Sequence, residues 1–277
     1  MLGLEPQLRA TLLGLAQTRC VDYIRRQPPM AGREDLAYVV VGSVATGLVT
    51  SASSIDIAVM ADKDAFKALT QDPAWNGERP WDAFIDGASL KYYCVAYDQV
   101  EQGLRELRDS YVYYYGSAVI IHDPTGKCAE FMANVRSALP DLRRQRLEGK
   151  LDMLRRRFSA MEAAFRYRDV MAAAAICVEM VTLAIKVTAL LDDVPFDPRS
   201  QLFLGGLAGR VGYQVEGIIR KLIGHIGELE YLGQTADTAA FRFPARMVEL
   251  INILSDEARS QGFEVGLEKP DPRCAEV

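Results

Sequence analysis

The residues best placed for chemistry surround a short loop between two apolar segments. Gly42 and Ser43 follow the first segment, and Ser54 and Asp56 open the second. Glycine lets a backbone approach a phosphate closely, and a serine hydroxyl can hydrogen-bond the phosphate oxygens. Carboxylates are preferred magnesium ligands. The pattern predicts an anion-binding loop in which Gly42, Ser43 and Ser54 contact the ligand and the carboxylate of Asp56 is the candidate metal ligand and catalytic group.

Two other charged residues are candidate catalytic groups. Lys91 lies in an alternating segment, 88–97, that contains no acid. Glu179 lies in the otherwise apolar segment 171–191, with Lys186 seven residues later. Burying a carboxylate is unfavourable unless it is paired, and burial raises its pKa. Glu179 is therefore predicted to be paired, as a structural residue bonded to a neighbouring helix would be.

Strands and helices alternate in the first half of the chain. Asp62 is expected to cap a helix, and Asp98 to cap the one after it. Asp86 and Gly87 form a favoured hairpin turn. The expected strands are 37–42, 55–60, the two arms of a hairpin within 81–97, and 117–121; the expected helices are 4–27, 63–71 and 99–108.

Beyond Pro140 the apolar spacing predicts helices alone. Their expected ranges are 141–168, 169–191, 205–232 and 240–261. The predicted fold class is therefore an α/β (α+β) domain with a mixed sheet, residues 1–139, followed by an all-helical bundle domain, residues 140–277.

Composition excludes several classes of protein. The net charge of −5 and pI of about 5.3 do not favour a nucleic-acid partner. Two histidines and five scattered cysteines do not form a zinc motif, and they indicate reduced thiols in the cytoplasm. The first residues do not resemble a signal peptide, and segment 171–191 carries two charges, so a membrane span is not expected.

Two residue clusters have alternative interpretations. One is a set of arginines that either forms a solvated helix face or binds an anionic substrate. The other is a run of tyrosines that either lines a ligand cleft or packs inside the fold. The arginines are Arg143, Arg144, Arg146, Arg155, Arg156 and Arg157, and the tyrosines are Tyr111, Tyr113, Tyr114 and Tyr115.

The loop motif resembles the nucleotidyltransferase superfamily, which has Gly-Ser, a spacer of about ten residues, and Asp-x-Asp on the next strand. The segment AVIIHDPTGKCAEFM resembles the stretch that closes the catalytic domain of antibiotic, aminoglycoside-type members. The likeness spans about residues 35–205. It implies a magnesium ion and a nucleoside triphosphate as cofactors, a small-molecule acceptor, a helical substrate-binding domain, and often a homodimer. It also implies that Glu179 is the general base acting on the acceptor hydroxyl.

The chain departs from this family at the metal ligands. Ser54 replaces the first of three acids, and Lys91 stands at the third position, or Tyr93 if the register shifts by two. The site charge changes from about −3 to about zero. Two unit charges ~4 Å apart in a partly screened site interact by about 4 kcal/mol, so Lys91 would oppose a metal ion. Lys91 is expected instead to pair with Asp56.

These departures leave three functions open. The first is transfer of a nucleoside monophosphate to a hydroxyl, with an impaired metal site. The second is a repurposed, metal-independent enzyme of a biosynthetic pathway, of the lyase, isomerase or cyclase type, that uses Asp56, Lys91 and Glu179. The third is a non-catalytic protein that binds a nucleotide or another ligand.

Overall fold

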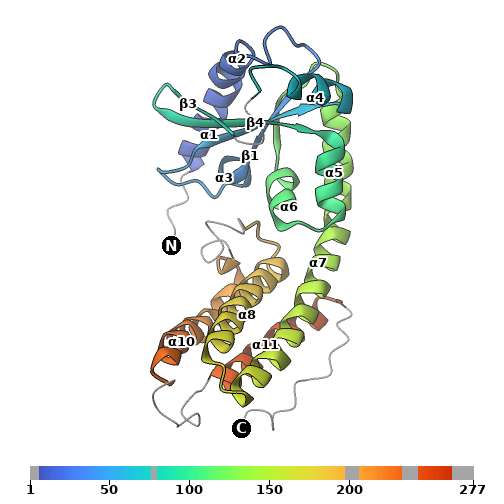
Figure 1. Ribbon diagram of the computed structural model, residues 1–277. Helices are drawn as coiled ribbons and strands as arrows, with labels where there is room; N and C mark the ends of the chain where they lie inside the picture. The colour runs from blue at the N-terminus through green and yellow to red at the C-terminus, as the bar shows by residue number, and fades with distance from the viewer. Residues whose placement is uncertain (1–5, 76–79, 197–205, 233–242, 264–277) are drawn as a thin grey trace. The chain divides into compact units, whose positions relative to one another are not determined.

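The computed structural model describes residues 6–75, 80–196, 206–232 and 243–263. The chain divides into two compact units, Met1–Leu142 and Arg143–Val277. The first unit has a mixed sheet with helices, and the second is helical, which confirms the predicted fold class (Figure 1). The helix α7, Lys127–Arg166, contains residues of both units.

The sheet of the first unit has five strands in the order β3-β4-β2-β1-β5. Strands β2 and β4 are parallel, and the other neighbouring pairs are antiparallel. The strands are β1 (Ala37–Val41), β2 (Ile55–Ala61), β3 (Trp81–Ile85), β4 (Ala88–Ala96) and β5 (Val119–His122). The strands lie close to the predicted segments.

Each face of the sheet packs on a separate core. Side chains alternate along a strand, so Ile55 and Ile57 face one core while Ala58 and Met60 face the other. The first core is closed by helices α1 (Pro6–Leu15), η1 (Ala16–Cys20), α2 (Val21–Ile24), α3 (Gly42–Thr46) and α4 (Lys63–Thr70). The second is closed by α5 (Tyr97–Arg105), α6 (Asp109–Gly116) and the start of α7.

Two expected helix caps are not formed. Asp62 has the extended backbone of a cap before α4, but its carboxylate pairs with Lys127 of α7. Asp98 lies inside the first turn of α5, because the helix begins one residue earlier at Tyr97. The cap there comes from Gln99, whose Oε1 accepts a hydrogen bond from the Ala96 backbone at 3.0 Å.

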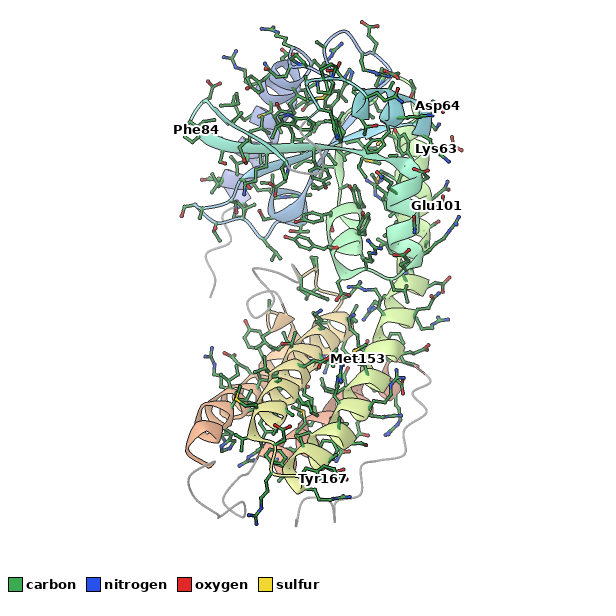
Figure 2. The ribbon with its side chains drawn as sticks, viewed as in Figure 1. Lys63, Asp64, Phe84, Glu101, Met153 and Tyr167 are labelled. Carbon is green, nitrogen blue, oxygen red and sulfur yellow. The ribbon has the colours of Figure 1, made fainter. Side chains whose placement is uncertain are left out.

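The β3–β4 hairpin turns at the predicted pair. Asp86 and Gly87 both have positive φ, 46° and 87°. Such a two-residue turn matches the twist of its strands and fixes the register, which pairs Ile85 with Ala88. Figure 2 shows Phe84 near the tip of this hairpin.

In the described part of the second unit, four long helices surround one core. Leu154, Cys177, Val215 and Leu254 each supply a buried side chain from a different helix. The helices are the C-terminal part of α7, α8 (Val170–Leu191), α10 (Arg210–Leu232) and α11 (Phe243–Ser260). Pro140 does not begin this region as expected, because α7 starts at Lys127 and continues through the proline.

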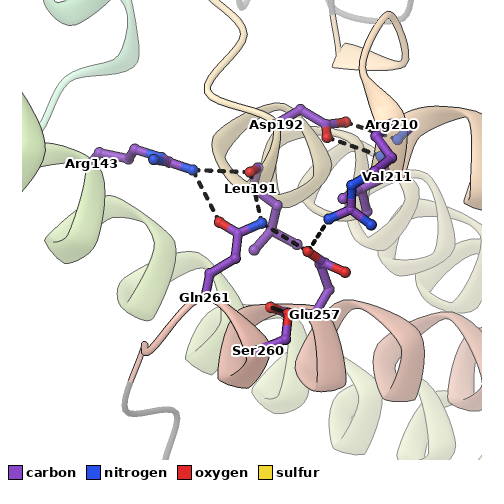
Figure 3. A network of polar contacts seen from close by, with 9 residues as sticks. Arg143, Leu191, Asp192, Arg210, Val211, Glu257, Ser260 and Gln261 are labelled. Carbon is purple, nitrogen blue, oxygen red and sulfur yellow. Dashed lines mark hydrogen bonds and ion pairs between the residues drawn. The ribbon is translucent and has the colours of Figure 1, made fainter.

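A polar network ties the ends of these helices together (Figure 3). Arg143 donates from Nε to the Leu190 carbonyl at 2.6 Å and from Nη2 to the Leu191 carbonyl at 2.9 Å. Asp192 accepts from the Val211 and Gly212 backbone amides, both at 2.9 Å. Asp192 therefore caps the start of α10.

Helix α8 is long and apolar enough, by length and composition, to cross a membrane. Core helices of soluble proteins pass the same test, and α8 supplies buried residues such as Met180 and Ala184 to the helical core. This helix is therefore compatible with the expectation, from the sequence, that segment 171–191 does not span a membrane.

Candidate functional site

Gly42 and Asp56 meet where strands β1 and β2 pair. Val41 is the partner of Asp56, and Gly42 follows it with φ +69°. A Cβ atom at Gly42 would lie 2.7 Å from Oδ2 of Asp56, which is closer than real Cβ contacts. Glycine is therefore required here both by its backbone conformation and by the carboxylate beneath it.

Ser54 contacts this carboxylate, and Arg9 holds the helix that follows Gly42. Ser54 donates its hydroxyl to Oδ1 of Asp56 at 2.9 Å. Ser43 begins the helix α3 inside the segment predicted to be a loop, and its hydroxyl has no hydrogen-bond partner among the described residues. Arg9 of α1 fixes α3 by donating to the Val44 and Ala45 carbonyls at 2.9 and 2.8 Å. The loop is thus held by the first helix of the chain.

Lys91 is the β4 partner of Asp56. In the parallel register of β2 and β4, Lys91, and not Tyr93, stands beside Asp56. Neighbouring strands lie about 4.8 Å apart, and paired residues point to the same face. The expected ion pair is not formed: Lys91 is exposed, and the ion pairs of the described residues do not include it. The ammonium group is therefore open to solvent beside the carboxylate.

Asp82 is a third charged residue on this face, and it was not among the sequence candidates. It is the β3 partner of Lys91, so Asp82, Lys91 and Asp56 form a row across three strands. The sequence contained the information needed to find Asp82, because a two-residue hairpin turn at 86–87 places residue 82 opposite residue 91. The row carries negative, positive and negative charge in that order.

The tyrosine run lies in α6 and packs beside the site. The Tyr93 and Tyr115 hydroxyls are 3.2 Å apart. Tyr114 would be 3.5 Å from a Cβ at Gly42. Burial raises the pKa of Tyr93, and the nearby Asp56 carboxylate adds to this effect. Tyr113 and Tyr115 are buried, as the packing interpretation predicts, and Tyr114 reaches the Gly42–Asp56 contact; a ligand cleft lined by these rings stays a prediction.

Glu179 differs from its expected surroundings. Its side chain is 40% exposed, and Oε2 pairs with Nε of Arg157 in α7 at 2.9 Å. The expectation of a buried glutamate is therefore wrong, although its pairing with a neighbouring helix is as predicted for a structural residue. Glu179 belongs to the second unit, whereas the Gly42, Ser54, Asp56 and Lys91 cluster belongs to the first.

Several of the clustered arginines bind groups of the second unit. Arg143 holds the end of α8, Arg156 pairs with Asp152, and Arg157 pairs with Glu179. Arg146 is buried, with its guanidinium carbon 5.5 Å from the centre of the Phe196 ring. These contacts tie the four side chains to the helical unit, and anion binding by the cluster stays a prediction.

The residues present do not fit a two-metal centre. No group of three or more histidine, cysteine, aspartate or glutamate side chains in the described part of the chain could hold a metal ion. Asp56 is flanked by Ser54, whose neutral hydroxyl is a poor magnesium ligand, and by cationic Lys91. A metal-assisted step is not supported by this donor set.

Comparison with known proteins finds likenesses among solved structures. No family model and no curated protein matches the chain. Among solved structures, the chain is similar to a nucleotidyltransferase-like protein from Exiguobacterium sibiricum 255-15, with a TM-score of 0.44 and 11% identity over 90% of this chain and 75% of that chain. A likeness at this TM-score and identity establishes neither the family nor the function of this chain.

Proposed function

We propose that this chain is a nucleotidyltransferase-fold protein that binds a small anionic molecule on the Asp56–Lys91 face without a two-metal centre. The proposal rests on the β2–β4 register, in which Lys91 is the strand partner of Asp56. A lysine is a point cation that binds phosphate or carboxylate directly. It occupies the face where a metal ion would otherwise supply the positive charge.

The surrounding groups support an anionic ligand. Ser43 begins α3, and its hydroxyl can donate to a ligand oxygen. Ser54 already donates to Asp56, which fixes the orientation of that carboxylate. Asp56 could then act as a base and Lys91 as an acid on the bound molecule, so metal-independent acid–base chemistry is the reaction class that this arrangement favours.

Nucleotidyl transfer to an antibiotic hydroxyl is less well supported. That reaction requires charge stabilisation at the triphosphate, and the described carboxylates do not form a group that would hold the metal ions for it. The proposal assigns Glu179 no catalytic role, because its carboxylate pairs with Arg157. The four described cysteines are free thiols, which supports the further proposal of a reducing, cytoplasmic setting.

Calorimetric titration with ATP and with inorganic pyrophosphate, both in EDTA, tests the proposal. Lys91→Ala is expected to weaken binding about tenfold or more, because it removes a charge-assisted hydrogen bond. Lys91→Arg should retain part of the affinity. Lys67→Ala, which removes an exposed lysine from α4, is the matched control and should bind like the wild type. Unchanged binding by Lys91→Ala, or no binding by the wild type, would contradict the proposal.

A further inference from the structure

The charged row across β3, β4 and β2 lies on a largely exposed part of the sheet. Further along β4 on the same face, Val95 packs on the second core, whereas Lys91 is exposed. The opposite face of β3 packs on the first core through side chains such as Trp81, so Asp82 points away from that core and is exposed. Asp82 and Lys91 are therefore accessible to a ligand, and Asp56 lies beside them, half-buried.

Asp82 and Lys91 do not neutralise each other. They are partners in the β3–β4 register, and partner side chains of an antiparallel pair have Cβ atoms about 4.5–5.5 Å apart. At that spacing an ion pair is within reach of a lysine side chain, yet neither residue forms one with another residue in the described ranges. Lys91 also has Asp56 as its partner on the other side. Two carboxylates thus flank one ammonium group, and the row has one negative charge in excess.

We propose that the ligand of Lys91 carries an ammonium group beside its anionic group, and that Asp82 binds this ammonium. The proposal rests on the proposed function, because Lys91 supplies the anion contact, and it names the ligand class: a small zwitterion whose two charged groups are a few bonds apart. A plain anion would pair with Lys91 alone and be repelled by the flanking carboxylates.

An ammonium group on the ligand turns one of these repulsions into a charge-assisted hydrogen bond. Asp82 is a better partner for it than Asp56. One oxygen of the Asp56 carboxylate already accepts the Ser54 hydroxyl, and the other lies against Gly42. Asp82 has its whole carboxylate available, because it is exposed and forms no ion pair with the described residues.

Two probes of equal length separate the ammonium contact from the anion contact. Phosphoethanolamine and propyl phosphate differ only in that an ammonium group replaces the terminal methyl group. At pH 8 both phosphates are doubly ionised, because their second pKa is about 6, and the amine is protonated, because its pKa is about 10. In calorimetry with EDTA, the wild type should bind phosphoethanolamine about threefold or more tightly than propyl phosphate.

Variants of Asp82 assign the ammonium contact to one side chain. Asp82→Asn should weaken binding of phosphoethanolamine and leave binding of propyl phosphate unchanged or tighter, since a repulsive charge is removed. The affinity ratio of the two probes then falls to near one. Asp82→Glu keeps the charge and should keep most of the ratio. Asp64→Asn, which neutralises an exposed carboxylate of α4 (Figure 2), is the matched control and should have the wild-type ratio.

The other outcomes overturn the inference, and they separate it from the proposed function. If the wild type binds both probes equally, or if Asp82→Asn keeps the ratio, the ammonium group does not bind Asp82. The proposed function still stands in that case if Lys91→Ala weakens binding of propyl phosphate. If Asp82→Asn weakens both probes alike, Asp82 maintains the site and does not recognise the ammonium group. If neither probe binds the wild type, the inference and the proposed function both fail.

Discussion

At the scale of single residues, close contacts decide what the site can hold. Gly42 is pressed against the Asp56 carboxylate, and Ser54 occupies the other oxygen of that group. Lys91 stands on the neighbouring strand at the partner position, with Asp82 beyond it. The site therefore combines one oriented carboxylate, one open cation and a second carboxylate beyond it, and we propose that the cation binds an anion there.

Replacing Gly42 by alanine tests this contact. Gly42→Ala should lower the free energy of unfolding by about 2 kcal/mol or more, since a side chain at positive φ is strained and its Cβ would press on Asp56. Urea unfolding measures the change. Gly14→Ala, in α1 with open space around the Cβ, is the control and should raise stability by up to about 1 kcal/mol. Equal effects of the two variants would show that the Gly42 contact is not needed.

At the scale of secondary-structure elements, local patterns predicted most of the fold. The pair Asp86-Gly87 predicted the hairpin, and the same turn determines that Asp82 faces Lys91. Long-range contacts were not predictable: Arg9 reaches the α3 carbonyls from 35 residues away. The exposure of Glu179 could not be predicted either. Helix α8 is apolar on nearly every side, so the periodicity of its sequence does not identify the buried face.

The junction between α8 and α10 supports a prediction at this scale. Asp192→Ala should destabilise the protein by about 1–2 kcal/mol, because it leaves the Val211 and Gly212 amides without their capping carboxylate. Thermal or urea unfolding gives the value. Asp256→Ala, which removes an exposed carboxylate from α11, should change stability by no more than about 0.5 kcal/mol. A loss for Asp192→Ala no larger than the control would argue against the cap.

At the scale of the whole molecule, both units contain buried thiols. Burial raises the pKa of Cys20 to about 11 and that of Cys177 to about 12. The native thiols hold their protons more tightly than unfolded thiols, whose pKa lies near 9. Their contribution to stability is thus complete below about pH 9 and is lost as the pH rises through 11 to 12.

This pattern predicts both slow thiol chemistry and alkaline unfolding. In a Cys274→Ser variant, which leaves the four described thiols, reaction with Ellman's reagent at pH 8 should be about 100-fold slower in the native protein than in urea, since the thiolate is the nucleophile. Stability measured by circular dichroism should fall between pH 9 and 12. Rapid native labelling, or constant stability across that range, would mean that the thiols are not buried as described.

The most direct test of the central claim is titration of the wild-type protein with ATP in magnesium and again in EDTA. If Lys91 supplies the positive charge in place of a metal centre, ATP should bind in both conditions. The two dissociation constants should agree within about threefold. Binding seen only with magnesium would show that Asp56 suffices to hold a metal ion, and it would contradict metal-independent anion binding at Lys91.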